Sequence, residues 1–138
     1  MKYFLAAAIC VPAIAWGAPQ TVTCPATLDV KSSATPTAEW QVFDSPEPHV
    51  LDHIGLYSGP PSELASLVPE TIRNKKGESQ DVWTIPADTQ ERIWISCIYT
   101  GTSVFIAKPI DKGSKRCQVR YKTTPTGTTL SVIDAHCE

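Results

Sequence analysis

The sequence predicts an all-β domain, either an antiparallel β-sandwich or a curved sheet of about seven or eight short strands. Apolar residues recur at every second position along most of the chain, which is the period of a strand with one buried face. Polar and proline-rich segments, with 12 prolines in 138 residues, separate these short patterns. Since no internal repeat is present and at most one short helix fits, we expect two packed layers of strands.

The first 17 residues predict a secretory signal peptide. Lys2 supplies a positive charge, residues 4–15 are uncharged, and Ala15-Trp16-Gly17 provides a small-residue cleavage site. The apolar stretch is too short for a membrane-spanning helix, which needs about 20 residues. We therefore expect no membrane span and a single exported domain over residues 18–138.

The charges of the mature chain are unevenly distributed. Without Lys2, 11 basic and 14 acidic side chains remain, and this small imbalance suggests neither nucleic acid nor an anionic membrane as a partner. Residues 39–91 hold ten acidic side chains against three basic ones, whereas residues 108–122 hold six basic side chains against one acidic one. The two parts of the domain therefore suit partners of opposite charge.

Three strands are predicted in the first half of the domain. Residues 22–30 alternate apolar and polar side chains, and Pro25, which has no N–H to donate, places this strand at a sheet edge or a bulge. Residues 39–43 fit a short strand between two loops. Residues 52–58 fit a third strand, which Gly59-Pro60-Pro61 ends.

The only helix candidate follows this break. Ser62 could cap a turn that carries Leu64, Leu67 and Val68 at helical spacing, but Pro69 would end it at once. A short helix and an extended segment fit these residues equally well.

Two hairpins are predicted next. Residues 73–80 form a polar tip that leads into a strand over residues 81–86. Residues 93–99 return through Thr100-Gly101 as residues 102–107. Because both of these strands carry apolar side chains on both faces, we expect them to be central and covered on both sides.

The last hairpin has one clear strand and one ambiguous strand. Residues 115–122 place Cys117, Val119 and Tyr121 on one face and cationic side chains on the other. After a turn at residues 124–127, residues 129–137 carry apolar side chains in both phases, so their register stays open.

Four cysteines in an exported domain predict two disulfides, with three possible pairings. Our first choice joins Cys24 to Cys97 and Cys117 to Cys137, with contributions of at most about 4.4 and about 3.3 kcal/mol in the loop-entropy model. A four-residue turn at 124–127 would place residue 134 opposite Cys117. The second bond therefore requires a longer loop or an irregular strand.

No residue pattern predicts catalysis, a metal site or a cofactor. Ser58 lacks a Gly-x-Ser-x-Gly elbow. His49 and His53 would share a face only on a helix, which the prolines before them oppose. His136 and Cys137 are neighbours on a strand and point to opposite faces. We expect a rigid scaffold that binds another molecule and is not an enzyme.

The candidate partner-binding residues are Asp52, Tyr57, Pro60, Pro61 and Glu63. Aromatic and rigid loop residues flanked by charge suit a protein interface, although a merely solvated loop is the alternative. The cationic face of residues 108–122 could instead contact an acidic protein or an anionic envelope polymer, or simply keep the domain soluble.

Several segments resemble a small secreted family of Gram-negative bacteria. They are Cys24-Pro25, Trp40, Leu56 to Pro69 (LYSGPPSELASLVP), Ile93 to Thr100 (IWISCIYT) and Arg116 to Tyr121 (RCQVRY). Members of that family look like periplasmic immunity proteins for type VI secretion effectors that attack peptidoglycan, notably of the L,D-transpeptidase kind. The resemblance implies a toxin inhibitor whose partner is a cognate effector protein; it assigns no inhibitory residue and no oligomeric state.

The mechanism that we expect is occlusion of the effector's cleft for the peptidoglycan stem peptide, with capture accelerated by complementary charge. Two alternatives stay open. A periplasmic lysozyme inhibitor would use the acidic portion equally well, and a non-catalytic envelope or peptidoglycan-binding protein would use the cationic strand.

Overall fold

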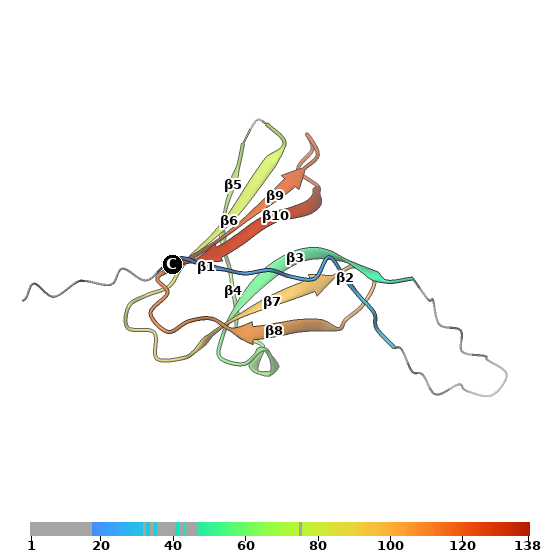
Figure 1. Cartoon of the computed structure of the whole chain (residues 1–138), viewed down its shortest axis with the longest axis horizontal. Helices are drawn as coiled ribbons and strands as arrows, with labels where there is room; N and C mark the ends of the chain where they lie inside the picture. The colour runs from blue at the N-terminus through green and yellow to red at the C-terminus, as the bar shows by residue number, and fades with distance from the viewer. Residues whose placement is uncertain are drawn as a thin grey trace, which may run out of the picture.

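The computed structural model describes residues 18–31, 33, 35, 41, 43, 47–74 and 76–138. Over these residues the protein is all-β and forms two five-stranded sheets (Figure 1). The strands are β1 (Gln20–Thr21), β2 (Thr27–Leu28), β3 (His49–Ser58), β4 (Ser66–Leu67), β5 (Glu70–Arg73), β6 (Glu78–Thr84), β7 (Ile93–Tyr99), β8 (Phe105–Pro109), β9 (Arg116–Thr123) and β10 (Thr129–Cys137). The predicted all-β class is confirmed. The predicted strand over residues 39–43 lies outside the described residues, apart from Gln41 and Phe43.

The first sheet has the strand order β1-β10-β9-β6-β5, with all neighbours antiparallel. Its central strand β9 has the predicted alternation. Cys117, Val119 and Tyr121 are buried on the inner face, whereas Arg116 and Lys122 are exposed. The outer face of β9 is therefore solvated and polar, as the alternation predicts.

The second sheet has the order β2-β3-β7-β8, with β4 paired to the end of β3. Ile54 and Leu56 on β3 and Ile95 on β7 are at most 2% exposed. They pack against residues of the first sheet, including Trp83 and Val119, in one hydrophobic core. In Figure 1 the two sheets converge at the end that holds the C terminus and spread apart toward the other end.

The first predicted strand is instead two very short strands that belong to different sheets. β1 pairs with β10 in the first sheet, and β2 pairs with β3 in the second. The chain crosses between the sheets around Pro25, which cannot donate to either ladder. A continuous strand over residues 22–30 is thus wrong, but the expected edge position is right for both pieces.

β8 is an edge strand, which corrects the prediction that both strands of this hairpin are central. β7 lies between β3 and β8, but β8 pairs only with β7. Phe105 and Ile106 are 38% and 37% exposed. The outward Phe105 stacks on Tyr57 of β3 along the sheet face, with ring centroids 6.1 Å apart. Apolar side chains here contact each other along one sheet rather than a covering layer.

Both predicted disulfides are present, Cys24–Cys97 and Cys117–Cys137. Thr129 pairs with Thr123, so the connecting loop has five residues, and two register shifts each add a residue to β10. The longer loop and the two bulges supply the three residues that a regular four-residue turn would lack. Cys137 consequently lies directly opposite Cys117.

The bulges also explain the ambiguous register of the last strand. The two extra residues are Leu130 and Ile133, which are 56% and 43% exposed. Each bulge shifts the alternation by one position, so that apolar residues occur in both phases although only one face is buried.

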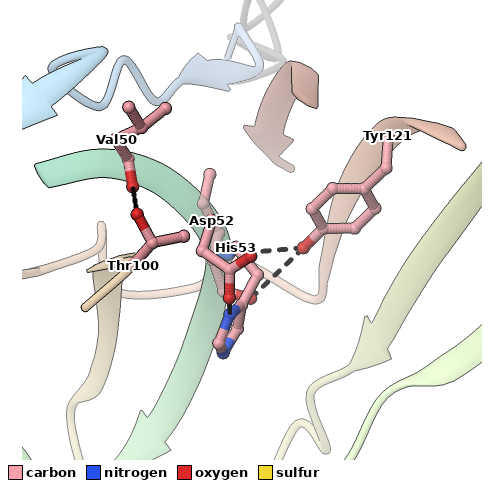
Figure 2. Close-up of polar contacts among 6 residues, drawn as sticks. Val50, Asp52, His53, Thr100 and Tyr121 are labelled. Carbon is pink, nitrogen blue, oxygen red and sulfur yellow. Dashed lines mark hydrogen bonds and ion pairs between the residues drawn. The ribbon is translucent and has the colours of Figure 1, made fainter. Parts of the chain in front are cut away.

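Tyr121 joins the two sheets by hydrogen bonds (Figure 2). Its hydroxyl lies 3.3 Å from the backbone nitrogen of Ile54, which donates to it, and 3.4 Å from the Ile54 carbonyl oxygen, to which it donates. Ile54 lies between the short partners β2 and β4, where this edge of β3 has no strand neighbour among the described residues. The Tyr121 hydroxyl therefore takes the place of a neighbouring strand.

Candidate functional site

The turn after β3 is a rigid loop. Residues 61–63 form a single 3-10 turn, η1 (Pro61–Glu63), and Glu63 N–H donates to the Pro60 carbonyl over 2.9 Å. Two further backbone bonds fix the loop base: Ser58 N–H to Ala65 O and Gly59 N–H to Arg92 O. The two prolines restrict their own backbone angles, so the loop has little freedom between these anchors.

The predicted helix over residues 62–68 reduces to this one turn. Leu64 follows it with φ 59° and ψ 19°, a left-handed conformation that stops helical growth. The chain then extends as β4 and meets Pro69. Of the two alternatives, the extended segment is therefore the better description beyond Glu63.

Leu64 is the only non-glycine residue with positive φ among the described residues. A left-handed conformation costs a bulky residue about 1–2 kcal/mol. The Leu64 side chain is nonetheless 83% exposed, and Val68, just beyond it, is 90% exposed. Burial within the domain therefore does not offset the backbone strain at Leu64, and it does not cover Val68.

The structure brings together four of the five predicted partner-binding residues. Tyr57 is the second-last residue of β3, and Pro60, Pro61 and Glu63 follow in the loop. Asp52 is separate from them. Because a strand rises about 3.3 Å per residue, Asp52 lies about 20 Å from Ser58 along β3. Its carboxylate accepts a hydrogen bond from His53 Nδ1 over 2.8 Å (Figure 2).

Two carboxylates meet at the base of the loop. A Cβ placed on Gly59 would come within 2.7 Å of Glu63 Oε2 and 3.9 Å of Glu91 Oε2. Neither carboxylate forms an ion pair with any residue that the structure describes. This pair gives the loop a negative base next to its apolar tip, and the sequence could not bring the two residues together because they belong to separate loops.

Hollows lie beside this loop at the same end of the sandwich. One, of about 590 Å³, is lined by the loop before β7 and the loop before β9. A neighbouring hollow of about 310 Å³ is more apolar and includes Leu67, Val68 and Trp83 in its wall. Sequence reasoning missed both, because three loops distant in sequence form them.

The cationic face of the first sheet is partly neutralised. Arg120 donates to both carboxylate oxygens of Asp134 on the adjacent strand β10. These hydrogen bonds lower the pKa of Asp134, and the same contact raises the pKa of Arg120. Lys122 lies opposite Glu78 on β6. The face therefore offers less free positive charge than its own strand suggests.

The residues considered for chemistry lie in separate places. His49 Nδ1 contacts the Thr100 carbonyl oxygen at 2.7 Å, whereas His53 contacts Asp52. Cys137 is oxidised in its disulfide beside His136. Within the described part of the chain, no three His, Cys, Asp or Glu side chains gather as metal ligands. The same part contains no helix long and apolar enough to cross a membrane.

Comparison with known proteins identifies the family. The chain is similar to an uncharacterized 16.3 kDa protein in the trpG 5' region of Azospirillum brasilense, with 25% identity over 115 residues that cover 79% of this chain and 77% of that protein. No solved structure matches. The family model of the type VI secretion system Tli immunity protein matches residues 45–138, which include eight of the ten strands. Such immunity proteins are generally non-catalytic, typically periplasmic and have a cognate toxin as partner. The chain therefore belongs to the Tli immunity protein family of type VI secretion.

Proposed function

We propose that the protein protects the periplasm against a type VI effector that attacks peptidoglycan, by binding that effector and covering its active site. The observation that carries this proposal is the family match over residues 45–138. Export and oxidation fit the same compartment, because both disulfides need an oxidising environment and peptidoglycan is reached from the periplasm.

The proposal that the effector attacks peptidoglycan rests on the sequence segments that resemble a family paired with L,D-transpeptidase effectors. An effector of that kind must admit a peptide stem into a cleft. A compact domain that binds over the cleft blocks it without any chemistry of its own, which suits a fold held by two disulfides and one core.

The contact surface that we propose comprises the end of β3 and the loop after it, with Tyr57, Pro60, Pro61 and Glu63. Tyr57 is half-buried by its stack on Phe105 and is therefore already ordered before binding. Ordered aromatic and proline residues lose little conformational entropy on association. Asp52 contributes only to long-range attraction, since it lies away from this surface.

The test is periplasmic co-expression with the effector encoded by the adjacent gene, followed by capture and purified assays. We expect a stable complex, loss of effector toxicity, and inhibition of its action on stem peptides. Excess stem peptide should slow complex formation if the two compete for the cleft. A complex that still processes stem peptides would contradict occlusion.

Failure of capture together with persisting toxicity would contradict the immunity function against that effector. Lysozyme inhibition assays and pelleting with purified peptidoglycan then test the two other binding functions directly.

Charge steering has a separate test. Asp52→Lys and Glu63→Lys should each slow association and reduce its dependence on salt, because attraction between complementary charges is screened as ionic strength rises. Unchanged association rates for both variants would contradict a role for this surface in capture.

A further inference from the structure

Leu64 combines two properties that intramolecular packing does not explain. It holds a strained left-handed backbone conformation, and its apolar side chain points into solvent with 83% of its surface exposed. Strained conformations persist only where the surrounding structure fixes them, and they concentrate at functional sites.

The loop is built to fix this residue. Leu64 N–H donates to the Pro61 carbonyl over 3.1 Å and closes the η1 turn. Ser58 and Gly59 anchor the loop base by backbone bonds to Ala65 and Arg92. The backbone of Leu64, and with it the direction in which the side chain leaves the loop, is consequently set before any partner is bound.

The surroundings of Leu64 specify the chemistry of a partner. The tip is apolar at Leu64, and Val68, four residues further along the chain, is also 90% exposed. The base is negative, since the Glu63 and Glu91 carboxylates both lie beside Gly59 without an ion pair among the described residues. A recess with an apolar floor and a cationic rim would match both features.

We infer that residues 59–65 form the segment that enters the effector, with Leu64 as the anchor in an apolar recess and with Glu63 and Glu91 paired to basic side chains at its rim. This inference rests on the proposed immunity function and deepens it. Because the backbone of Leu64 is already held before binding, association does not have to order it, and burial of the exposed side chain supplies the gain in affinity.

Leu64→Gly tests the inference, because glycine removes the side chain and accepts positive φ without strain. We expect the dissociation constant for the purified effector of the adjacent gene to rise at least tenfold. The urea midpoint of the free protein should be unchanged or higher. Leu130→Ala, an exposed leucine in the bulge at the opposite end of the sandwich, is the matched control and should change the dissociation constant less than twofold.

A second variant, Glu63→Lys/Glu91→Lys, tests the rim independently. It should weaken binding at least tenfold at low salt, with a smaller difference at high salt. Unaltered affinity of Leu64→Gly would overturn the anchor, and unaltered affinity of the double variant would overturn the rim.

The wild-type protein separates this inference from the immunity function. If the wild type binds the effector while Leu64→Gly binds equally well, only the loop assignment is wrong. If the wild type does not bind, the proposed function is wrong for that effector and the loop assignment is overturned with it.

Discussion

The outer faces of the two sheets carry different side-chain contacts. The first sheet, β1-β10-β9-β6-β5, exposes polar side chains and an Arg120–Asp134 ion pair. The second sheet, β2-β3-β7-β8, exposes part of an aromatic stack between Tyr57 and Phe105. Both outer faces also carry exposed apolar residues, such as Ile72 on β5 and Phe105 on β8, so the two sheets differ by an ion pair on one face and an aromatic stack on the other.

This difference shows that apolar side chains on both faces of a strand do not establish a covering layer. On β8 the outward Phe105 contacts Tyr57 of β3 in the same sheet and remains partly exposed. The stack and the loop with Leu64 both adjoin the end of β3. The binding surface that we propose therefore belongs to the second sheet, and the first sheet packs against the inner face of that sheet.

The largest expected effect comes from the disulfide that fixes the second sheet to the crossing segment. Cys24→Ala/Cys97→Ala opens a loop with a sequence separation of 73 and should lower the free energy of unfolding by up to about 4 kcal/mol. Cys117→Ala/Cys137→Ala opens a separation of 20 within the first sheet and should cost up to about 3 kcal/mol. Urea unfolding under oxidising conditions measures both, and a reversed order would contradict the loop-entropy account.

The next effect concerns the bond between the sheets. Tyr121→Phe leaves the N–H and carbonyl of Ile54 without a partner inside the domain and should cost about 1–3 kcal/mol. Tyr99→Phe is the comparison variant, because the equally buried Tyr99 loses only one bond, to the carbonyl of the exposed Pro25. An equal loss for both would show that the Tyr121 bridge has no special value.

Tyr121 also gives the protein an alkaline limit. Burial, more than the neighbouring carboxylates, raises its pKa above the ordinary value of 10.0. The neutral form is favoured by the folded state, so this stabilisation is complete below about pH 10 and is lost as the pH rises toward the higher folded value. Urea midpoints from pH 8 to 11 should fall more steeply for the wild type than for Tyr121→Phe.

A smaller effect is expected on the apolar outer face. Phe105→Ser removes the stack on Tyr57 and should lower the free energy of unfolding by about 1 kcal/mol. This figure combines the lost burial of a partly exposed ring with the lost aromatic contact. Gln118→Ser on the outer face of the first sheet is the matched change and should stay within about 0.5 kcal/mol. Similar losses for the two variants would erase the contrast between the faces.

The smallest effect belongs to the ion pair on the polar face. Asp134→Asn should shift the melting temperature by less than about 4 °C, because the side chains of Arg120 and Asp134 are 41% and 39% exposed and solvent screens the pair. Arg120 lowers the pKa of Asp134, so the pair stabilises the fold above the ordinary carboxylate pKa and loses this effect as the pH falls through the lowered value. A larger shift at neutral pH would contradict the view of this face as merely solvated.

The sequence predicted correctly those strands in which buried and exposed residues alternate without interruption. β9 and β7 follow the alternation, and the pairing of all four cysteines was inferred from chain order. The exchange of sheets around Pro25 and the edge position of β8 depend on which strands meet in space, which alternation does not encode. The register of β10 could not be predicted from its sequence, because two single-residue bulges interrupt the alternation of inward and outward residues.

The candidate site was predicted only in part. The turn residues Pro60, Pro61 and Glu63 and the preceding Tyr57 lie together, because they are neighbours in sequence. Glu91 and the hollows between loops come from distant segments and had no local signal. Leu64 was noted only for its helical spacing with Leu67 and Val68, since a sequence pattern cannot show that a leucine is left-handed and exposed.

The pairing of β1 with β10 restricts the order in which the domain can fold. Gln20 lies opposite Cys137, so the first described strand has no ladder partner until β10 is present. Closure of long sequence separations is slow, and the first sheet cannot be completed from the N terminus onward. The first sheet should therefore close only after β10 has been made, and until then Cys117 lacks the partner of its disulfide.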